Sequence, residues 1–475
     1  MDPDPQPSVS PAEGVTHTER YLAKLCRRSF LLLWSYPGVF RDQGRMDGKG
    51  DGKEVCDLLV VFDNHIIIFS DKDCQFQDYA NVRVAWARWF KKAVLASAKQ
   101  VWGAERWIRD FPSRLFLDRK CTVPFPINLP KPDEAIFHRI VVAHDASRAC
   151  KNLLGGSGSL MLNNTLVGEA HLSEMPFMIG RLDENRGYVH VFDDTTLDIV
   201  MSTLDTVSDF TAYLVKKEKF LTGDMLVNAA GEEHLLATYL GKLNEDGVHD
   251  FVIDEGFTAV SLGEGIWENF VNSPERKAQI AHDEISYSWD TLIEKFAHHL
   301  MTGTQYFGSG HPIQEQEIAF RFMAREPRTR RRMLAISLHE VLDKSQTAKF
   351  FSSRVMQSED ERFPYYVFLF MHRKPDLTDD EYRNMRMHLL SDYCEVAKLV
   401  HPAAKDIIGI ASEAGLPQRR SEDFIYLDAR HWTDEDQNRA KEKQDSLGIL
   451  KEVSRQAARE YEYPVDHEGK PRREG

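Results

Sequence analysis

The chain has 475 residues, with 60 lysines and arginines against 74 aspartates and glutamates, so its formal net charge is −14. At roughly 100–200 residues per domain, this length predicts about two to four domains. The negative charge excludes a chain-wide cationic coat for nucleic acid, so any such surface must be local. No apolar run approaches the roughly 20 residues of a membrane span. The six cysteines show no spacing typical of zinc or disulfides, and we expect a cytoplasmic protein.

A change in composition near residues 271–280 divides the chain into a strand-rich half and a helix-rich half. We expect a disordered, acidic and proline-rich tail over 1–15 and a first domain over 16–270. A second, mixed α/β domain is expected over 280–451, followed by a charged tail over 452–475. The sequence therefore predicts an α/β protein with two folded parts.

Periodicity and capping signals predict the elements of the first half. A capping box, in which Glu19 follows Thr16 by three residues, predicts the start of the first helix. Two short apolar runs around Asp63-Asn64 predict a β-hairpin with a two-residue turn. The other elements expected in this half are helices over 82–110, 195–204 and 205–219 and strands over 137–143, 178–181 and 188–192.

The second half contains no motif typical of a known chemistry. A basic cluster, REPRTRRRM, lies at the start of its third helix, where arginines oppose the helix dipole and an anionic partner would stabilise them. The favoured interpretation of this cluster is a solvated surface. The elements expected here are helices over 288–301, 313–323, 329–342 and 379–400 and strands over 365–371, 406–410 and 423–427. They form a core without an evident site, so we expect a sensing or regulatory domain.

The hairpin carries the most informative side chains. A turn at Asp63-Asn64 puts Leu59 opposite Ile68 and Asp57 opposite Ser70. Because side chains two residues apart share a face of a strand, Asp57, Ser70 and Lys72 converge on one side. The sequence therefore predicts a polar cluster at the open end of an apolar hairpin.

This arrangement resembles the PD-(D/E)XK, or restriction-endonuclease-like, nuclease superfamily. There, an acid on one strand and an acid-x-lysine on the next bind a divalent metal and position water against a phosphodiester. The order helix, acid-bearing strand, lysine-bearing strand, helix, strand is similar to the αβββαβ core of that superfamily, over residues 16–145. The resemblance implies Asp57 as the first acid, Lys72 as the catalytic lysine, and Mg²⁺ or Mn²⁺ as the cofactor.

The position of the second acid departs from the pattern, because Ser70 has no carboxylate. Some members of the superfamily carry serine there and recruit an acid from the following helix, which makes Glu105 a candidate metal ligand. Asp71 is the alternative if a β-bulge rotates it inward. The resemblance also suggests Glu19 as a further ligand and Gln100 as a helical glutamine near the metal.

Each of these residues has a structural alternative. Asp57 and Lys72 can form an ordinary ion pair at a sheet edge. Glu19 can serve only as a helix cap. Gln100 and Glu105 can lie on a solvated helix surface.

The segment from Arg83 to Lys120 favours a nucleic-acid partner. It has ten basic residues against three acids, which is +7 within a chain of −14, and four tryptophans are interleaved. A basic surface beside a metal–carboxylate hairpin suits a phosphate backbone. The alternative is an amphipathic helix with core tryptophans and solvated charges. The nucleic-acid-binding candidates are Lys91, Lys92, Lys99, Arg106 and Arg109.

The leading hypothesis is a metal-dependent endonuclease that hydrolyses phosphodiester bonds of nucleic acid, with DNA as the favoured substrate. The two-part architecture is similar to that of stand-alone antiphage defence nucleases, which implies gating by the C-terminal domain, a phage-derived protein as trigger, and a possible homodimer. The competing hypothesis is a catalytically inactive nuclease fold that binds nucleic acid or protein as a sensor. The serine at position 70 favours this second hypothesis.

Overall fold

The computed structural model describes residues 14–43, 51–77, 80–307, 312–358, 360–414, 421–452, 454 and 460–472. The chain is mixed α/β and divides into two compact units. Unit 1 comprises residues 1–277, 294–317 and 465–470, and unit 2 comprises residues 278–293, 318–464 and 471–475. Most of the tail expected over 1–15, and parts of the one expected over 452–475, lie outside the described residues.

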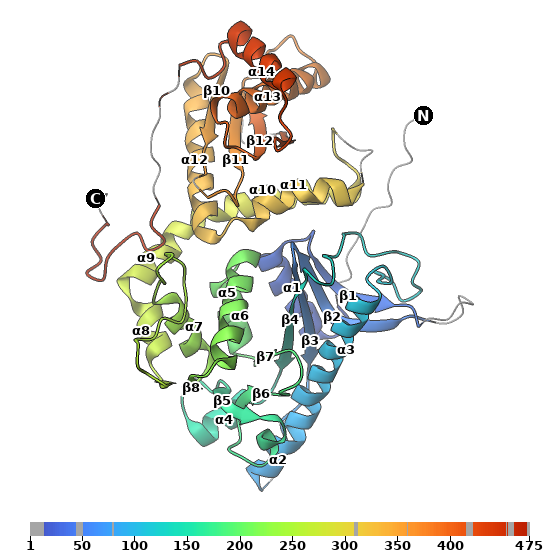
Figure 1. The fold of residues 1–475 in the computed structure, drawn as a ribbon, viewed down its shortest axis with the longest axis vertical. Coiled ribbons are helices and arrows are strands. Elements are labelled where there is room, and N and C mark those ends of the chain that lie inside the picture. Colours follow the sequence, from blue (N-terminus) through green and yellow to red (C-terminus); the bar gives the residue numbers. More distant parts are fainter. Residues whose placement is uncertain are drawn as a thin grey trace. The chain divides into compact units, whose positions relative to one another are not determined.

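The elements of unit 1 are shown in Figure 1 from blue to yellow-green. Its helices are α1 (His17–Phe30), α2 (Val82–Phe90), the π-helical segment Lys91–Leu95, α3 (Ala96–Asp110), α4 (Ser147–Leu154), the 3₁₀ segment Gly168–Leu172, α5 (Thr196–Thr203), α6 (Val207–Thr222), α7 (Glu232–Leu240) and α8 (Ile266–Asn272). Its strands are β1 (Ser35–Arg41), β2 (Lys53–Phe62), β3 (His65–Lys72), β4 (Ile136–Ala143), β5 (Met161–Val167), β6 (Met178–Arg181), β7 (Val189–Phe192), β8 (Leu226–Ala229) and β9 (Ala259–Leu262).

The larger sheet of unit 1 has the strand order β1-β2-β3-β4-β7. β1, β2 and β3 are antiparallel neighbours, whereas β4 runs parallel to β3 and to β7. Leu59 pairs with Ile68 and Phe62 with His65, which confirms the predicted hairpin, its register and its two-residue turn. Asp63, at the turn, has φ 54°, a conformation that aspartate tolerates. The order α1, β1, β2, β3, α2–α3, β4 is an αβββαβ sequence of elements.

Unit 1 contains strands that the sequence-based analysis did not predict, namely β1, β5, β8 and β9. β1 was not predicted, because its sequence SYPGVFR contains Pro37 and Gly38, which weaken a strand signal. It forms nevertheless, because it pairs with β2 along the edge of the sheet. β6 and β7, which follow each other in the chain, belong to different sheets, since β6 joins a second sheet of order β6-β5-β8-β9.

Helices α1 and α3 cover opposite faces of the larger sheet (Figure 1). The Phe30 ring on α1 lies 6.4 Å from that of Phe69, whereas Gln100 on α3 bonds to Ser70. Phe69 and Ser70 are neighbours in β3, and neighbouring side chains point to opposite faces of a strand. The face that carries Asp57 and Ser70 is therefore the one that α3 covers.

The helical segment 82–110 is confirmed as one continuous run, with five π-helical residues in its middle. Trp86 and Trp89 are buried in the core, as the amphipathic alternative predicted. The charged side chains of Lys91, Lys92 and Lys99 are exposed. The burial of these side chains is therefore that of an amphipathic helix, with tryptophans in the core and lysines exposed to solvent.

Unit 2 is built on a four-stranded sheet of order β10-β11-β12-β13. Its elements are α12 (Arg328–Thr347), β10 (Phe351–Met356), β11 (Tyr365–Met371), α13 (Asp379–Val400), β12 (Asp406–Glu413), β13 (Glu422–Asp428) and α14 (Asp434–Leu447). Helices α9 (Pro274–Asp283), α10 (Tyr287–Thr302) and α11 (Ile313–Arg325) and the 3₁₀ segment Glu284–Ser286 lie along the segments where the chain passes between the units. The bounds predicted for β11 and α13 match the structure.

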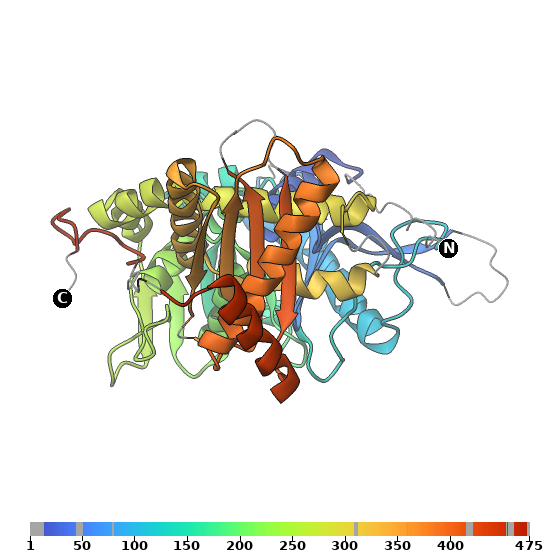
Figure 2. The same ribbon diagram turned by 90° about the horizontal axis from the view of Figure 1, so that it is seen from above.

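Helix α13 lies across one face of this sheet (Figure 2). Leu390 and Cys394 pack there against β11 and β12. A side chain at Gly409 of β12 would bring its Cβ within 2.7 Å of the Cys394 sulfur and 3.0 Å of Leu390. Glycine at this position therefore lets the helix approach the sheet closely.

The basic cluster predicted as solvated surface is a buried ion-pair network of unit 2. Arg331 and Arg332 are 0% exposed. Arg331 donates to Asp290 at 2.7 Å and Arg332 donates to Asp283 at 3.0 Å. The prediction was wrong, because the acids that neutralise the arginines come from a segment about 40 residues earlier in the chain.

The segment 294–317 belongs to unit 1, so a chain that ends before it lacks part of that unit. Glu294 accepts a hydrogen bond from the Leu32 N–H at 2.6 Å, and Glu317 accepts one from the buried Trp34 indole at 2.5 Å. A chain ending at residue 275 leaves both donors without these partners. Each unsatisfied buried group costs about 1–3 kcal/mol.

We therefore expect a protein of residues 1–275 to unfold at a markedly lower urea concentration than the corresponding transition of the full chain. Circular dichroism during urea titration measures this. The matched control is Glu317→Gln in the full chain, which retains an acceptor for the Trp34 indole and should cost less. Equal midpoints for the truncated and full chains would contradict the assignment of 294–317 to unit 1.

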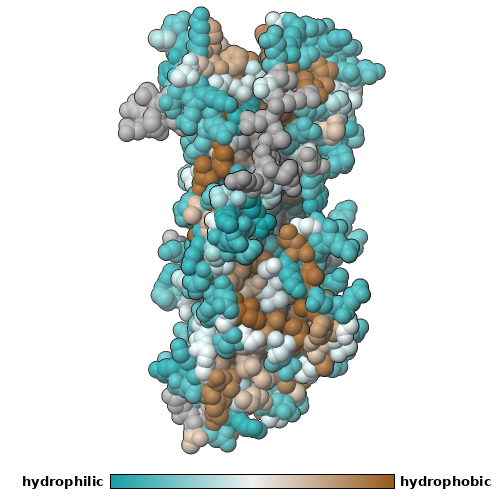
Figure 3. Space-filling view, turned by 90° about the vertical axis from the view of Figure 1, so that its left-hand side faces the viewer, coloured by the Kyte–Doolittle hydropathy of each residue, from teal (hydrophilic) through white to brown (hydrophobic). Residues whose placement is uncertain are grey.

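Among the described residues, no helix is long and apolar enough to cross a bilayer. Hydrophilic side chains dominate the face seen in Figure 3, and apolar side chains form separate patches between them.

Candidate active site at the open end of the β2–β3 hairpin

Counted from the turn, the pairing of β2 with β3 ends at the Leu58–Phe69 pair, and Asp57 is the next residue of β2 beyond it. Beyond this point the Asp57 carboxylate takes the place of a backbone acceptor, because its Oδ2 receives the Asp71 N–H at 2.6 Å. The two strands therefore part where the predicted polar residues begin. The hairpin opens into a site instead of continuing as a ladder.

Asp57, Ser70 and Gln100 are brought together on the face that α3 covers. The Ser70 hydroxyl donates to Gln100 Oε1 at 3.1 Å, and Gln100 Nε2 lies 3.5 Å from Asp57 Oδ1. Ser70 is fully buried, and Asp57 is partly buried. The amide of Gln100 thus connects the acid of β2 with the serine of β3, and leaves Asp57 Oδ1 only weakly engaged.

Burial and, to a smaller extent, neighbouring carboxylates raise the pKa of Asp57. Burial raises the pKa of Asp57 to about 6, and the charges of Glu19 and Asp71 act in the same direction. Burial raises the pKa of Glu54 to about 7, with further contributions from Asp57 and Glu19. The charge of Arg119 acts on Glu54 in the opposite direction. Two carboxyl groups with raised pKa values in one place form a site that a cation would stabilise.

Glu54 was missed by the sequence-based analysis. It lies at the start of β2, three residues before Asp57, where strict alternation puts it on the other face. The register between β1 and β2 shifts between Val39 and Phe40, opposite this part of β2. An acid so close to Asp57 was the available signal, but a regular strand pattern does not bring the two together.

Glu19 serves as a helix cap. Its Oε2 accepts the N–H groups of Val15 at 2.7 Å and Thr16 at 3.2 Å, and the Thr16 hydroxyl accepts the Glu19 N–H. This confirms the predicted capping box. Its charge still acts on Asp57 and Glu54, so its influence on the site is electrostatic.

Asp71 points away from the face of Asp57 and Ser70. β3 and β4 pair in regular parallel register from His65 to Lys72, so the bulge proposed to turn Asp71 inward is absent. The Asp71 side chain instead binds His144, whose Nε2 lies 2.5 Å from Asp71 Oδ1. The other Asp71 oxygen is buried and has no partner among the described residues.

His144 bridges two carboxylates at the carboxyl ends of the parallel strands. Its Nδ1 lies 2.5 Å from Asp194 Oδ1, opposite the contact with Asp71. Burial lowers the pKa of His144, but the hydrogen bonds and charges of both acids outweigh it and raise that pKa to about 10. The imidazole is therefore a cation at neutral pH. The sequence offered no signal for it, because 73 residues separate His144 from Asp71.

Lys72 is exposed and has no ion-pair partner among the described residues, so it does not form the ordinary ion pair with Asp57. Burial raises the pKa of the Cys74 thiol, and the positive charges of Lys92 and Lys72 both act against that rise. Lys92 and Lys72 are therefore neighbours of the same thiol. The π-helical segment brings a second cation to the end of the hairpin.

Glu105 and Arg109 are engaged with other side chains. The Glu105 carboxylate pairs with Arg139 and Arg109, which hold its pKa below the usual value against the effect of burial. Arg109 also donates to the Pro132 carbonyl at 2.9 Å and lies over the Phe137 ring. The structure does not bring Glu105 to Asp57.

The carboxylates at the hairpin opening are the candidate ligands of a metal ion. Within the described ranges, no group of three or more histidine, cysteine, aspartate and glutamate side chains could hold a metal ion. A Mg²⁺ ion does not require such a group, since it keeps several waters and is commonly bound through one or two carboxylates. Asp57 and Glu54, with the amide oxygen of Gln100, are donors of the hard type that it prefers.

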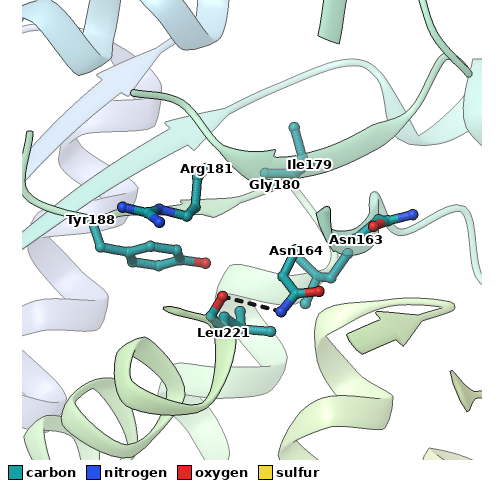
Figure 4. A pocket seen from close by; sticks show the side chains of 8 residues that line it. Asn163, Asn164, Ile179, Gly180, Arg181, Tyr188 and Leu221 are labelled. Atoms are coloured by element: carbon teal, nitrogen blue, oxygen red, sulfur yellow. Dashed lines mark hydrogen bonds between the residues drawn. The ribbon is translucent and has the colours of Figure 1, made fainter. Parts of the chain in front are cut away.

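A small cavity of unit 1 lies away from these residues, between β5, β6 and α6 (Figure 4). Asn164 closes it on one side by donating to the Leu221 carbonyl at 3.3 Å. The cavity has no room for a water molecule. It is a packing defect next to the second sheet, and none of the candidate site residues line it.

Comparisons with protein-family models, with curated proteins and with solved structures find no match to this chain.

Proposed function

We propose that the protein is a metal-dependent nuclease that hydrolyses phosphodiester bonds of nucleic acid at the open end of the β2–β3 hairpin. One observation carries the proposal. Asp57 and Glu54 lie at the open end of the hairpin, as does Lys72, which has no ion-pair partner among the described residues. Burial raises the pKa of both acids, and the charge of Asp57 adds to the rise at Glu54. Carboxylates for a divalent cation and a free ammonium group for a phosphate are the two charges that phosphodiester hydrolysis needs.

Asp57 and Glu54 would hold Mg²⁺ or Mn²⁺ with water molecules, and Gln100 would orient Asp57 Oδ1. When bound, the ion supplies a bound water of lowered pKa and neutralises charge on the phosphate. Lys72 would donate to a non-bridging oxygen of the phosphate, where negative charge develops. Ser70 has no carboxylate, and its hydroxyl fixes the Gln100 amide, so it positions Asp57 indirectly.

The decisive experiment incubates the purified full-length protein with supercoiled plasmid, linear DNA and RNA, each with Mg²⁺, Mn²⁺ or EDTA. We expect cleavage of at least one substrate with metal and none with EDTA. Absence of cleavage of all three substrates, with Mg²⁺ and with Mn²⁺, would overturn the proposal.

Lys72→Met tests the second charge. We expect cleavage to fall by at least about 100-fold, or about 2.7 kcal/mol, while stabilisation of the protein by Mg²⁺ in a thermal melt stays unchanged. Lys131→Met is the matched control, since Lys131 is exposed and pairs with Glu134 elsewhere in unit 1. Equal cleavage by Lys72→Met and Lys131→Met would exclude Lys72 from the reaction.

The competing function is a nucleic-acid or protein sensor with an inactive nuclease fold. Ser70 favours it, because the usual second acid is missing from that position. Such a protein would bind nucleic acid equally well with Mg²⁺ and EDTA and would show no Mg²⁺-dependent thermal shift. The same melts and cleavage assays therefore separate the two functions.

We further propose that unit 2 gates the nuclease in an antiphage role, with a phage-derived protein as the trigger. The support is that unit 2 has its own sheet and its own hydrophobic core. Binding of a trigger to one of two states would shift their populations. Cells that express the full chain should lose viability only on infection, and the Asp57→Ala variant should be inert in both conditions.

A further inference from the structure

The exposed face of the long helical segment carries a row of cations, Lys92, Lys99 and Arg106. Lys99 and Arg106, seven residues apart on α3, lie on one side of that helix, roughly opposite the buried Val101, and Lys92 precedes them on the π-helical segment. At 1.5 Å per residue, Lys99 and Arg106 are about 10 Å apart along the α3 axis. All three side chains are exposed, and none has an ion-pair partner among the described residues. In a chain with 74 acidic residues, three unpaired cations in a row indicate an anionic partner.

The row leads to the candidate active site. Lys92 stands at its near end, where it and Lys72 act on the same Cys74 thiol. Gln100, next to Lys99 in the chain, reaches Asp57 from the same helix. A polyanion that follows the row therefore arrives at the hairpin opening.

The four tryptophans of the segment have no indole left for a ligand to use. Trp86 and Trp89 are buried, and their indole N–H groups donate to the carbonyls of His171 and Cys74. The indole N–H groups of Trp102 and Trp107 donate to the carbonyls of Gly187 and Arg114.

The ring faces are also occupied. Arg186 lies 4.9 Å from the Trp102 ring centre, and Arg41 and Arg114 lie over the Trp107 ring at 4.4 and 5.2 Å. Proteins that bind single strands stack bases on open aromatic rings, a contact worth about 1–3 kcal/mol per base. The four tryptophans therefore offer no stacking platform, and what the helix presents is charge.

Gly103 lies within the row, between Lys99 and Arg106, on the exposed side of α3. A Cβ added there meets nothing within 4 Å, so no contact inside the protein requires glycine. Glycine in an exposed helix interior is less favourable than alanine by about 1 kcal/mol. A residue without a side chain between two cations allows a ligand backbone to approach the helix closely.

From these observations we infer that the outer face of the long helical segment, defined by Lys92, Lys99, Gly103 and Arg106, binds the sugar–phosphate backbone of a double-stranded nucleic acid. This inference rests on the proposed nuclease function and specifies its substrate class. The contacts are to phosphates, so they carry no base sequence. The duplex is selected because its charge density is regular and its bases need no stacking partner.

The test measures binding by the full-length protein in EDTA, which prevents metal-dependent cleavage. The probes are a 30-bp DNA duplex, the RNA duplex of the same sequence and one single strand of each, at several salt concentrations. We expect at least one duplex to bind at least tenfold more tightly than its single strand. Equal or tighter binding of the single strands, or binding to none of the four, would overturn the inference.

Two variants localise the contact. Lys92→Glu, Lys99→Glu and Arg106→Glu combined should weaken duplex binding and lower the slope of log K against log salt by about 2.7, at about 0.9 per lost phosphate contact. Lys131→Glu, Lys405→Glu and Lys451→Glu combined change the net charge equally, at exposed lysines that have carboxylate partners elsewhere. Equal losses in the two triple variants would overturn the inference.

Gly103→Leu adds bulk without changing charge. We expect it to weaken duplex binding at least tenfold with little change in the melting temperature. Unchanged binding would contradict the close approach at Gly103. Because binding is measured in EDTA, a wild-type protein that binds duplex but cleaves nothing with metal would refute the nuclease function while leaving this surface supported.

Discussion

Replacement of Asp57 by asparagine should abolish metal-dependent cleavage, by at least about 100-fold, or about 2.7 kcal/mol of transition-state stabilisation. Asparagine preserves the shape of the side chain and an oxygen that can accept the Asp71 N–H, so the fold is retained. What is lost is the negative charge that would hold the cation beside Glu54. Cleavage of plasmid by wild type and variant, at equal concentration with Mg²⁺, measures the effect.

The same substitution should stabilise the protein at neutral pH. The folded-state pKa of Asp57, about 6, lies above the ordinary value of about 3.9. Protonation of Asp57 therefore stabilises the folded state of the wild type. This stabilisation is lost as the pH rises from about 4 to 6 and is absent above 6, where Asp57 is ionised. The shift of about two pKa units corresponds to a gain of about 2–3 kcal/mol in the free energy of unfolding of Asp57→Asn. This is an upper value, because the asparagine oxygen accepts a weaker hydrogen bond than a carboxylate does.

Urea denaturation without metal should thus show Asp57→Asn more stable than wild type at pH 7.5 and close to wild type at pH 4. With Mg²⁺ the difference should shrink, because only the wild type gains from the ion. A variant that is inactive and also less stable at pH 7.5 would indicate that Asp57 is structural. A variant that still cleaves at the wild-type rate would exclude it as a metal ligand.

The second large effect is expected at a buried ion pair in unit 1. Lys217 of α6 is 0% exposed and donates to Glu232 of α7 at 2.5 Å; the Tyr213 hydroxyl donates to the other Glu232 oxygen at 2.6 Å. Lys217→Met removes the cation and leaves the Glu232 carboxylate buried with one neutral donor. Loss of one partner of a buried pair costs about 3–5 kcal/mol.

The free energy of unfolding from urea titration measures this cost, with Lys131→Met as the control. Lys131 and Glu134 form an exposed pair, so its loss should change stability far less than the loss of the buried pair. The double variant Lys217→Met/Glu232→Gln should recover much of the loss, because no buried charge remains. Equal stabilities of Lys217→Met and Lys131→Met would show that water reaches the pair when the protein is folded.

The residues that sequence patterns located correctly depend on local interactions. The hairpin has the predicted register, because with a two-residue turn only one register keeps the apolar side chains of both strands on the same face. β11 and α13 matched their predicted bounds, and Glu19 formed its capping box, since caps and periodicity involve neighbours within a few residues. The hairpin pattern also placed Asp57 and Ser70 on one face, where Gln100 contacts both.

The residues that patterns misjudged depend on partners far along the chain. Arg331 and Arg332 look solvated in sequence, and only tertiary structure pairs them with Asp290 and Asp283. His144 gains its cationic state from acids 73 and 50 residues away.

The sequence by itself therefore determined the α/β elements, the hairpin and the polar end that Asp57 begins. Tertiary structure alone decided the surroundings of Asp57: Glu54 lies close enough for Asp57 to raise its pKa, the Asp71 side chain binds His144, and Glu105 pairs with Arg139. The physical reason is that a strand's alternation specifies the face of each side chain, whereas its charge partner is set by whichever helix or strand packs over that face.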